Sequence, residues 1–411
     1  MKLPYRTPLG WKTPPLGAVA TALVPQRDKP EDLNGPIPWV RIEDFDGPEI
    51  SRSKSGQGVT PETVAAMNLR VMPIGTVVCT CSCSMGTTAL VTAPLVTNQT
   101  FIGIVPDPAH LESRYLYYAL AAYKPHLDAE ATGAIQQYLS RDDFLHLRLP
   151  LPPLPLQQTI ADYLDAETSW IDALLRDAER RRHLAQERVW ARFFEKVTST
   201  HAPRVPLRRV LLSISDGPFG SAFTSGDYTD DGAFVVRLGN IGLAEFHFEP
   251  EARIPMTLYA SFLRHHVRPG DLLIAGLGDE GRHAGRACVA PNLGPAMVKG
   301  KCFCARVDEG LADPRYLALY LSSSLGAQEL ALVSHGSGRV MINLEIAKAL
   351  PVILPVLSLQ TEIVDQTAAD QNRADRVAAF LGRQIALLFE RRQVLITAAV
   401  TGQLHIPGVA A

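Results

Sequence analysis

The chain has no long apolar run and no mark of export. None of its hydrophobic segments approaches the roughly 20 residues that a membrane-spanning helix requires. The N-terminal segment, MKLPYRTPLGWKTPPLG, lacks the apolar stretch of a signal peptide. Hydrophobic residues make up 46% of the chain and charged residues 20%, which is typical of a globular protein. We therefore expect a soluble, cytoplasmic protein whose 411 residues form about two to four domains.

Cysteine is scarce, and its spacing argues against a metal site. The six cysteines fall in two clusters, Cys79/Cys81/Cys83 and Cys288/Cys302/Cys304. The first cluster, CTCSC, has single-residue gaps, whereas paired zinc ligands need two or more residues between them. In a strand, alternate residues share one face, so we interpret these thiols as small buried hydrophobic groups. A long cytosolic chain is also not expected to be a disulfide framework.

Neither basic nor acidic residues are in large excess: the chain has 40 Lys and Arg and 42 Asp and Glu. The net charge of −2 argues against a protein that binds nucleic acid through a broad basic face of its own. It remains compatible with a protein that reads bases while a partner supplies part of the phosphate contacts.

Catalytic motifs are absent too. HExxH, GxSxG, a helical Glu-x-x-His pair and the Asn/Asp/Ser-Pro-Pro-aromatic motif of adenine methyltransferases do not occur. GLGDEG (276–281) matches GxGxxG, but a strand-like segment follows it in place of the helix that binds a pyrophosphate. GPAMVKGK (294–301) has one residue too many between its glycines for a phosphate loop, and Cys302 replaces the required Ser or Thr. We predict a binding protein with no cofactor and no metal.

What the chain does contain is an internal repeat. LPPLPLQQTI (151–160) and LPVLSLQTEI (354–363) share six of ten residues at an offset of 203. The same offset relates two later pairs, Glu187-Arg188 to Glu390-Arg391 and Val197-Thr198 to Val400-Thr401. Upstream, the offset is 201 for RYL (114–116 and 315–317), 195 for segments 75–86 and 270–281, and 196 for WVRI (39–42) and VVRL (235–238). The chain is therefore two copies of a unit of roughly 200 residues.

Each copy has two parts of different character. Short β-rich runs broken by Gly, Pro, Asn and Asp predict strands and hairpins, followed by short helices. A Pro- and Gly-free segment then begins near residue 156, and its counterpart begins near residue 358, with Gly382 as its one interruption. Apolar residues at alternating threes and fours predict a coiled-coil seam, formed by Ile160, Leu164, Ile171, Leu174 and Ala178, and by Ala374, Val377, Leu381 and Leu388.

The two long helices have matching lengths, so packing them together buries both apolar stripes. We predict an α+β fold in which two similar mixed α/β domains are separated by two long antiparallel coiled-coil helices, with an internal pseudo-two-fold repeat. A parallel pair, or pairing between two molecules, would bury the same stripes. The expected boundaries are 1–150 and 203–353 for the domains, 151–202 for the first helix, and 354–411 for the second helix and tail.

The repeated LPxLxLQ motif predicts a joint between each domain and its helix. Proline ends the strand and sets φ for the helix start, leucine packs the domain on the helix, and glutamine lies where free backbone donors remain. The expected joint residues are Leu151, Pro152, Leu154, Gln157, Ile160, Leu354, Pro355, Leu357, Gln360 and Ile363.

The combination resembles a known family. Two globular units, each leaving through LPxLxxQ into a long helix, with ITAAVTGQ near the end (396–403), resemble the DNA-specificity subunit of type I restriction-modification systems. SDGPFGS (215–221) is similar to turns in the recognition domains of that family. The likeness spans essentially the whole chain, although the first copy has VTST (197–200) where the second has VTGQ.

The resemblance implies a non-catalytic, sequence-specific DNA-binding protein. Each domain would be a target-recognition domain for one half of a bipartite double-stranded DNA site. The helices would set the spacing between the halves and dock two DNA adenine methyltransferase subunits, with a motor-nuclease restriction subunit as a further partner. Thr401 and Gly402 would join the joint residues in partner docking.

Candidate base-reading residues are polar or basic side chains in loops, because Arg and Lys can bind guanine and Gln can bind adenine. They are Arg52, Lys54, Gln57, Ser221, Thr224, Ser225, Arg282, His283 and Arg339. Two rival interpretations remain, a protein–protein scaffold with two binding heads and an enzyme with an unrecognised site near CTCSC. Sequence-selective DNA binding would exclude the first, and stoichiometric zinc would favour the second.

Overall fold

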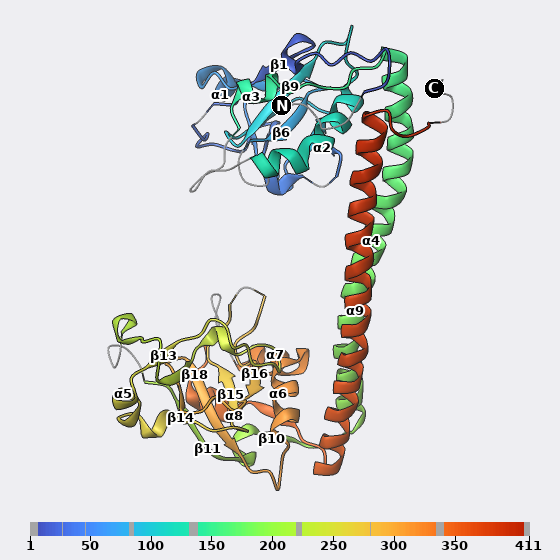
Figure 1. Ribbon diagram of the computed structural model, residues 1–411. Coiled ribbons are helices and arrows are strands. Elements are labelled where there is room, and N and C mark those ends of the chain that lie inside the picture. The colour runs from blue at the N-terminus through green and yellow to red at the C-terminus, as the bar shows by residue number, and fades with distance from the viewer. Residues whose placement is uncertain are drawn as a thin grey trace. The chain divides into compact units, whose positions relative to one another are not determined.

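The computed structural model describes residues 7–406 except 27, 46, 82–85, 131–138, 219–223, 280 and 334–340. It divides into two compact units, Met1–Glu179 with Gly382–Ala411, and Arg180–Leu381. Each unit holds one α/β domain together with part of each of two long helices, α4 (Leu154–Ser199) and α9 (Leu357–Val400) (Figure 1). No helix among the described residues is both long and apolar enough to cross a bilayer.

Unit 1 contains two β-sheets. The larger sheet has the order β1 (Ala20–Leu23), β9 (Phe101–Pro106), β6 (Val77–Thr80), β7 (Thr88–Val91) and β3 (Glu49–Ile50). The smaller sheet has the order β4 (Gly58–Val59), β2 (Ile37–Val40), β8 (Leu95–Thr97) and β5 (Val71–Met72). The helices of this domain are α1 (Pro61–Ala66), α2 (Ser113–Glu130) and α3 (Arg141–Leu145). Apolar residues of α2 pack against β6 and β9 in the main core of the unit.

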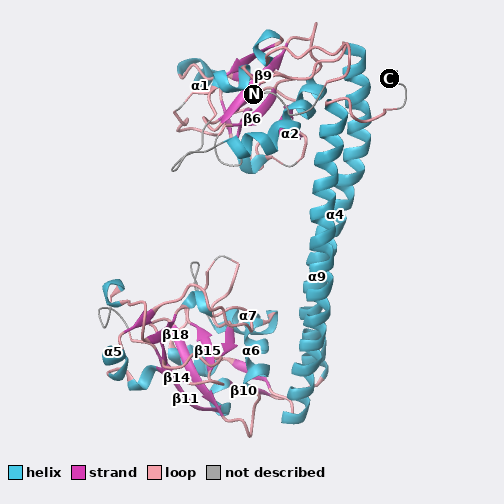
Figure 2. Ribbon diagram, viewed as in Figure 1, coloured by secondary structure: helices cyan, strands magenta, loops and turns pink. Residues whose placement is uncertain are grey.

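Unit 2 repeats this arrangement. Its larger sheet has the order β11 (Leu211–Asp216), β18 (Cys302–Val307), β15 (Leu272–Ala275) and β16 (Ala287–Val289). Its smaller sheet has the order β13 (Arg253–Ile254), β12 (Ala233–Val236), β17 (Ala296–Val298) and β14 (His266–Val267), and β10 (Arg204–Pro206) pairs with β19 (Pro351–Ile353). The helices are α5 (Met256–Ala260), α6 (Pro314–Ser322), α7 (Ser324–Val333) and α8 (Leu344–Ala349) (Figure 2).

The predicted repeat is confirmed down to strand register. In the smaller sheet of unit 1, β2 runs parallel to β8 with Trp39 opposite Val96. In unit 2, β12 runs parallel to β17 with Val235 opposite Met297. These partners are related by the offsets of 196 and 201 that the sequence contains. Two copies of one fold therefore account for the duplicated sequence, as expected.

The cysteines are packed as small hydrophobic groups wherever the structure describes them. Cys79 and Cys81 are buried in unit 1, as are the three cysteines of unit 2, whereas Cys83 lies outside the described residues. Burial raises the pKa of Cys288 and of Cys302 to about 12, so both thiols stay protonated near neutral pH. The described residues contain no group of His, Cys, Asp and Glu that could hold a metal ion.

The long helices run antiparallel within each unit. In unit 1, the start of α4 lies beside the end of α9, where Ile160 and Ala399 line one pocket. Farther along α4, Asp172 pairs with Arg392 at 3.0 Å. In unit 2, Gln186 exchanges two hydrogen bonds with Gln371, at 3.0 and 3.1 Å.

The predicted seam is buried at six of its nine positions, half-buried at Leu174 and Leu388, and exposed at Val377. Ile160, Leu164 and Ile171 are buried as expected. In the next helical turn Leu175 is buried in place of Leu174, which is only half-buried. Val377 is 44% exposed, because it lines an open groove on the helix pair in place of packing in its seam. The domain also packs against these helices, so a heptad pattern alone does not identify every buried position.

A buried glutamine forms the centre of each joint. In unit 1, Gln157 accepts a hydrogen bond from the Glu112 backbone N–H and donates to the carbonyls of His110 and Pro152, each at 2.9 Å. In unit 2, Gln360 repeats the pattern with the Asp313 N–H and the carbonyls of Leu311 and Pro355. The amide satisfies backbone groups of the helix start and of the loop before α2 or α6, so it fastens the domain to its helix.

Replacing Gln157 with Ala should lower the free energy of unfolding of unit 1 by about 2–4 kcal/mol, because three backbone groups lose their partner in a buried place. The change is measured by urea unfolding of the full chain. The neighbouring Gln158 is exposed and is the matched control, for which replacement by Ala should change stability by less than about 0.5 kcal/mol. Equal losses for the two variants would contradict the role assigned to the buried amide.

Candidate nucleic-acid interface

Three predicted base readers of unit 1 line one hollow. Arg52, Lys54 and Gln57 lie in the segment that follows β3 and leads into β4. Their hollow has a volume of about 550 Å³, and its remaining lining is formed by Gly35, Pro36, Pro38, Ser53 and Gly56. The structure therefore brings together candidates that the sequence placed only within one short stretch.

A buried carboxylate shapes this segment. Asp44 accepts hydrogen bonds from the backbone N–H of Arg41 at 2.7 Å, from the N–H of Lys54 at 2.8 Å and from the Ser53 hydroxyl at 3.2 Å. The next turn passes so close to the chain that a Cβ atom on Gly58 would lie 2.2 Å from the carbonyl oxygen of Gly35. The loop is thus held by its backbone, which leaves the side chains of Arg52 and Lys54 exposed.

The chemistry of the hollow suits contact with nucleic acid. Arg52 and Lys54 provide two cations at the surface. The Gln57 side chain is half-buried, and its Oε1 atom has no hydrogen-bond partner among the described residues. An amide with free bonding capacity beside two cations can bind both a base edge and a phosphate.

The predicted readers of unit 2 are less uniform. Ser221 and Arg339 lie outside the described residues, and Ser225 is the first residue of the short helix η5 (Ser225–Asp227). Thr224 precedes this helix, and both its N–H and its hydroxyl donate to the Asp227 carboxylate, at 2.6 and 3.0 Å. These bonds, the backbone one first, lower the pKa of Asp227. Thr224 therefore already has a local role in ordering its loop.

Arg282 and His283 are also engaged within the protein. The Arg282 guanidinium binds Asp279 through two bonds, Nε to Oδ1 and Nη2 to Oδ2, both at 2.9 Å. His283 lies 2.9 Å from the carbonyl oxygen of Leu321 through Nε2, and burial lowers its pKa. The neutral ring then donates this hydrogen bond. To read guanine with its planar fork, Arg282 would first have to release Asp279.

A fully buried arginine organises this region. The Arg286 side chain is completely buried and donates to the backbone carbonyls of Ile241, Leu277, His283 and Leu238. It also binds the Asp279 carboxylate at 3.0 Å. Five bonds satisfy nearly the whole guanidinium, so Arg286 ties the GLGDEG hairpin to the loop after β12. No helix follows GLGDEG among the described residues of 276–286, as the prediction of a hairpin turn requires.

Sequence reasoning missed a second set of basic residues. Arg237 follows β12 and Lys299 follows β17, and the preceding residues of these parallel strands pair directly. The two side chains therefore lie at the same edge of the smaller sheet. The Tyr228 ring lies with them: Lys299 Nζ is 2.7 Å from its hydroxyl, and the Arg237 guanidinium is 5.9 Å from its centroid.

Unit 1 has an equivalent of Arg237 at the same edge. Arg41 follows β2 as Arg237 follows β12. The backbone N–H of Arg41 binds the Asp44 side chain, and that of Arg237 binds the Asn240 side chain at 2.8 Å. In both arginines the Nε atom is buried without a hydrogen-bond partner among the described residues. The repeat at offset 196 contained this signal, since it aligns the two arginines.

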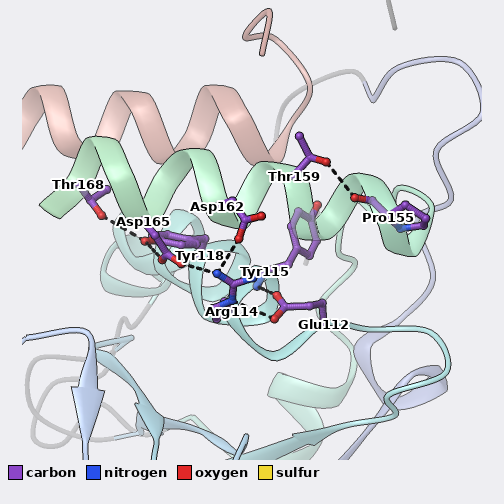
Figure 3. Close-up of polar contacts among 9 residues, drawn as sticks. All are labelled: Glu112, Arg114, Tyr115, Tyr118, Pro155, Thr159, Asp162, Asp165 and Thr168. Carbon is purple, nitrogen blue, oxygen red and sulfur yellow. Dashed lines mark hydrogen bonds and ion pairs between the residues drawn. The ribbon is translucent and has the colours of Figure 1, made fainter. Parts of the chain in front are cut away.

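The predicted joint residues converge at the start of each helix. Leu151, Pro152, Gln157, Ile160, Pro355, Gln360 and Ile363 are buried, and Leu154, Leu354 and Leu357 are half-buried. Arg114 adds ion pairs from α2 to Asp162 and Asp165 of α4, at 2.8 and 2.7 Å (Figure 3). Thr401 is buried, and Gly402 has φ +71° with no room for a Cβ atom beside Pro8.

These features together define a class of duplicated two-domain protein. The chain consists of two copies of an α/β domain, each fastened to a long helix and each presenting a basic residue at the edge of its smaller sheet. A family model for the type I restriction modification DNA specificity domain matches residues 8–178. The match covers the first copy of the repeat and the first part of α4.

Curated relatives and solved structures are similar over different spans. A type I restriction enzyme specificity subunit, MjaIX from Methanocaldococcus jannaschii, is 28% identical over 188 residues, covering 44% of this chain and 42% of the relative. The EcoBI specificity subunit from Escherichia coli is 23% identical over 392 residues, covering 90% of this chain and 80% of the relative. The chain thus spans less than half of the first relative and most of the second.

A solved structure shares the fold. One chain from a structure concerning complex assembly and conformational transition of the type I R-M system has a TM-score of 0.69 and 19% sequence identity. The likeness covers 98% of this chain and 100% of that chain. The fold predicted from the repeat is therefore confirmed, with mixed α/β domains and long helices.

Replacing Arg286 with Ala should lower the free energy of unfolding by about 3–5 kcal/mol, since four buried carbonyls and a carboxylate lose their donor. The matched control is Arg282→Ala, which breaks a partly exposed pair with the same Asp279 and should cost about 1 kcal/mol or less. Thermal unfolding of the two variants measures the difference. A stable Arg286→Ala variant would mean that the buried guanidinium does not hold this loop.

Proposed function

We propose that residues 1–150 and 203–353 are target-recognition domains that each read one half of a bipartite double-stranded DNA sequence. Residues 151–202 and 354–411 form the helices that set the distance between the two half-sites. The helices and joints dock two DNA adenine methyltransferase subunits, and a motor-nuclease restriction subunit joins the complex in a restriction system. The protein itself performs no catalysis and works on DNA in the cytoplasm.

One observation carries this proposal. The two domains share one framework, but the loops on it differ in chemistry. Between the short helix after β2 and strand β4, unit 1 exposes the cations Arg52 and Lys54. Between the short helix after β12 and strand β13, unit 2 exposes Glu249 and Glu251. A shared framework with different polar loops is what reading two unlike half-sites requires.

The charge of the chain agrees with an assembly in which partner subunits bind the phosphates and these domains read the bases. Phosphate contacts supply affinity that does not depend on sequence, whereas contacts to base edges supply specificity. A net charge of −2 leaves little for binding a DNA backbone alone. Partner subunits would then provide much of the phosphate contact, and the few exposed cations of these domains would act at base edges or at single phosphates.

Arg52→Ala should relax one base position in only one of the two half-sites, because a bidentate arginine contributes about 1–3 kcal/mol of discrimination at its base. Genome-wide mapping of N6-methyladenine in the host, with the gene intact, deleted or carrying the variant, measures this. Deletion should remove methylation from one gapped, two-part motif. Arg70→Ala, an exposed arginine of the same domain that does not line the hollow, should leave the motif unchanged.

The outcomes separate the proposal from its rival. If every methylated motif survives deletion of the gene in a host whose methyltransferase is expressed, the specificity role is wrong and a protein–protein scaffold replaces it. If the motif disappears on deletion but Arg52→Ala leaves it unchanged, the specificity role holds and Arg52 is not a reader.

Shortening both helices by one heptad should shorten the gap between the half-sites without altering either half. Deleting 176–182 together with 379–385 removes segments related by the offset of 203. Seven residues correspond to about 10.5 Å of helix, or about three base pairs. Deleting them rotates the apolar face of the helix by only about 20°. Deleting 176–182 alone should abolish recognition, because it breaks the helix pairing. An unchanged gap in the double deletion would contradict the proposal that the helices set the distance between the half-sites.

A further inference from the structure

One cation occupies the same place in both units, although the loops around it differ. Arg41 follows β2 and Arg237 follows β12, and the offset of 196 relates them. Lys299 lies at the same edge of unit 2, but it corresponds to Asn98 of unit 1 at the offset of 201. The arginine is therefore the cation that the two copies share at this edge of the smaller sheet.

In unit 1, a buried side chain three residues farther along holds the arginine beside the candidate base readers. The Asp44 carboxylate accepts a hydrogen bond from the backbone N–H of Arg41 at 2.7 Å and another from the N–H of Lys54 at 2.8 Å. Asp44 is only 5% exposed. A single carboxylate thus fixes the backbone of Arg41 next to the loop that carries Arg52 and Lys54.

In unit 2, Asn240 has the position and the task of Asp44. Its Oδ1 atom accepts a hydrogen bond from the N–H of Arg237 at 2.8 Å. Its Nδ2 atom donates to the carbonyls of His247 at 2.9 Å and Pro250 at 3.3 Å. The loop held in this way carries exposed glutamates in place of exposed cations. The arginine and the buried residue that holds it are therefore constant in kind, whereas the loop changes its charge.

Each guanidinium keeps bonding capacity at its outer end. Arg41 pairs through Nη1 with Glu43 at 3.0 Å, and Arg237 donates through Nη2 to the Pro250 carbonyl at 2.9 Å. The other terminal nitrogen of each arginine binds no acceptor among the described residues. Glu43 is exposed and corresponds to Gly239 in unit 2. Its pair with Arg41 is therefore weak and is not a feature that both copies need.

A cation shared by two domains that read different half-sites suits a feature that every DNA sequence has. The backbone phosphate is such a feature, whereas base edges differ from one sequence to the next. A guanidinium binds phosphate through charge-assisted hydrogen bonds. The loops suit the opposite task, because their side chains differ between the two copies.

We propose that Arg41 and Arg237 each bind one phosphate of the DNA backbone, beside the bases that the neighbouring loop reads. This inference rests on the function proposed above and divides each domain into two parts. The arginine supplies affinity that does not depend on sequence, and the loop supplies specificity. Asp44 and Asn240 are positioning residues, because each sets the distance between the phosphate contact and the loop.

The salt dependence of DNA binding tests the assignment. Arg41→Gln and Arg237→Gln remove the charge, and the full chain with its methyltransferase subunits is titrated with two duplexes at several salt concentrations. One duplex carries the gapped motif found by methyladenine mapping, and the other has the same bases scrambled. Each variant should bind both duplexes about tenfold more weakly at low salt and reduce the slope of log K against log salt by about 0.9. The methylated motif should not change.

Two sets of variants serve as controls. Arg41→Lys and Arg237→Lys keep the positive charge, so they should keep the slope. Arg70→Gln and Arg209→Gln remove exposed arginines of unit 1 and unit 2 that lie away from this sheet edge in sequence, and they should change neither the affinity nor the slope. Arg41→Met retains an apolar stem and replaces the glutamine variant if that variant does not fold.

A second measurement modifies the DNA and leaves the protein unchanged. Single phosphates along each half-site are replaced by uncharged methylphosphonates. The wild-type complex should lose about tenfold in affinity at one position in each half-site. At that position the glutamine variant of the corresponding unit should lose nothing further, because the two changes remove the same contact.

Three outcomes would overturn the inference. They are an unchanged slope in folded glutamine variants, a relaxed base position in the methylated motif, which would make the arginine a base reader, and a half-site without any sensitive phosphate. A lower melting temperature with an unchanged slope belongs to the first case and would mean a purely structural arginine. Failure of the proposed function looks different, because methyladenine mapping would then yield no motif that depends on this gene.

Discussion

The structure depends on one buried side-chain amide in each copy. Gln157 and Gln360 each join the first turn of a long helix to the loop that precedes the domain helix behind it. An amide can accept one bond and donate two at once, which neither a carboxylate nor an ammonium group can do. The surrounding leucines and prolines exclude water, so the cost of losing these bonds is high. The domain is therefore fixed to its helix by chemistry that permits almost no substitution.

A rigid joint has consequences for the surface that reads DNA. Because the helix start, the domain helix and the two sheets form one continuous packed body, the edge of the smaller sheet is positioned relative to the joint. Arg41 and Arg237 occupy the same place on that edge in the two copies, and each carries a buried Nε atom without a hydrogen-bond partner among the described residues. The loops beyond the edge then differ in sequence and charge without disturbing the framework.

Much of the architecture could be predicted because the sequence contains two copies of the same unit. The offsets of 195, 196, 201 and 203 place the strands of one copy on those of the other, and the joint glutamines follow from the repeated motif. What could not be predicted depends on side-chain geometry. Arg282 and His283 are of residue types that can read bases, but their polar atoms already bind the Asp279 carboxylate and the Leu321 carbonyl within the protein. Val377 fitted the heptad, yet it is 44% exposed and lines a groove formed by residues of the two long helices.

The comparison of the two copies separates structural roles from binding roles. Where both copies must satisfy the same buried backbone groups, one residue type solves the problem, and the same residue recurs, as Gln157 and Gln360 do. Exposed loop positions have no such requirement, so Arg52 and Lys54 have no basic counterparts in the acidic segment around Glu249. Tyr117 and Tyr118 form a third case, because they are buried in unit 1 yet replaced in unit 2 by Ala318 and Leu319. In unit 2 the Ala318 side chain is still only 2% exposed, whereas Leu319 is half-buried and lines a groove together with Val189 and Val364. Apolar surface that stays in contact with water is a cost unless a partner covers it.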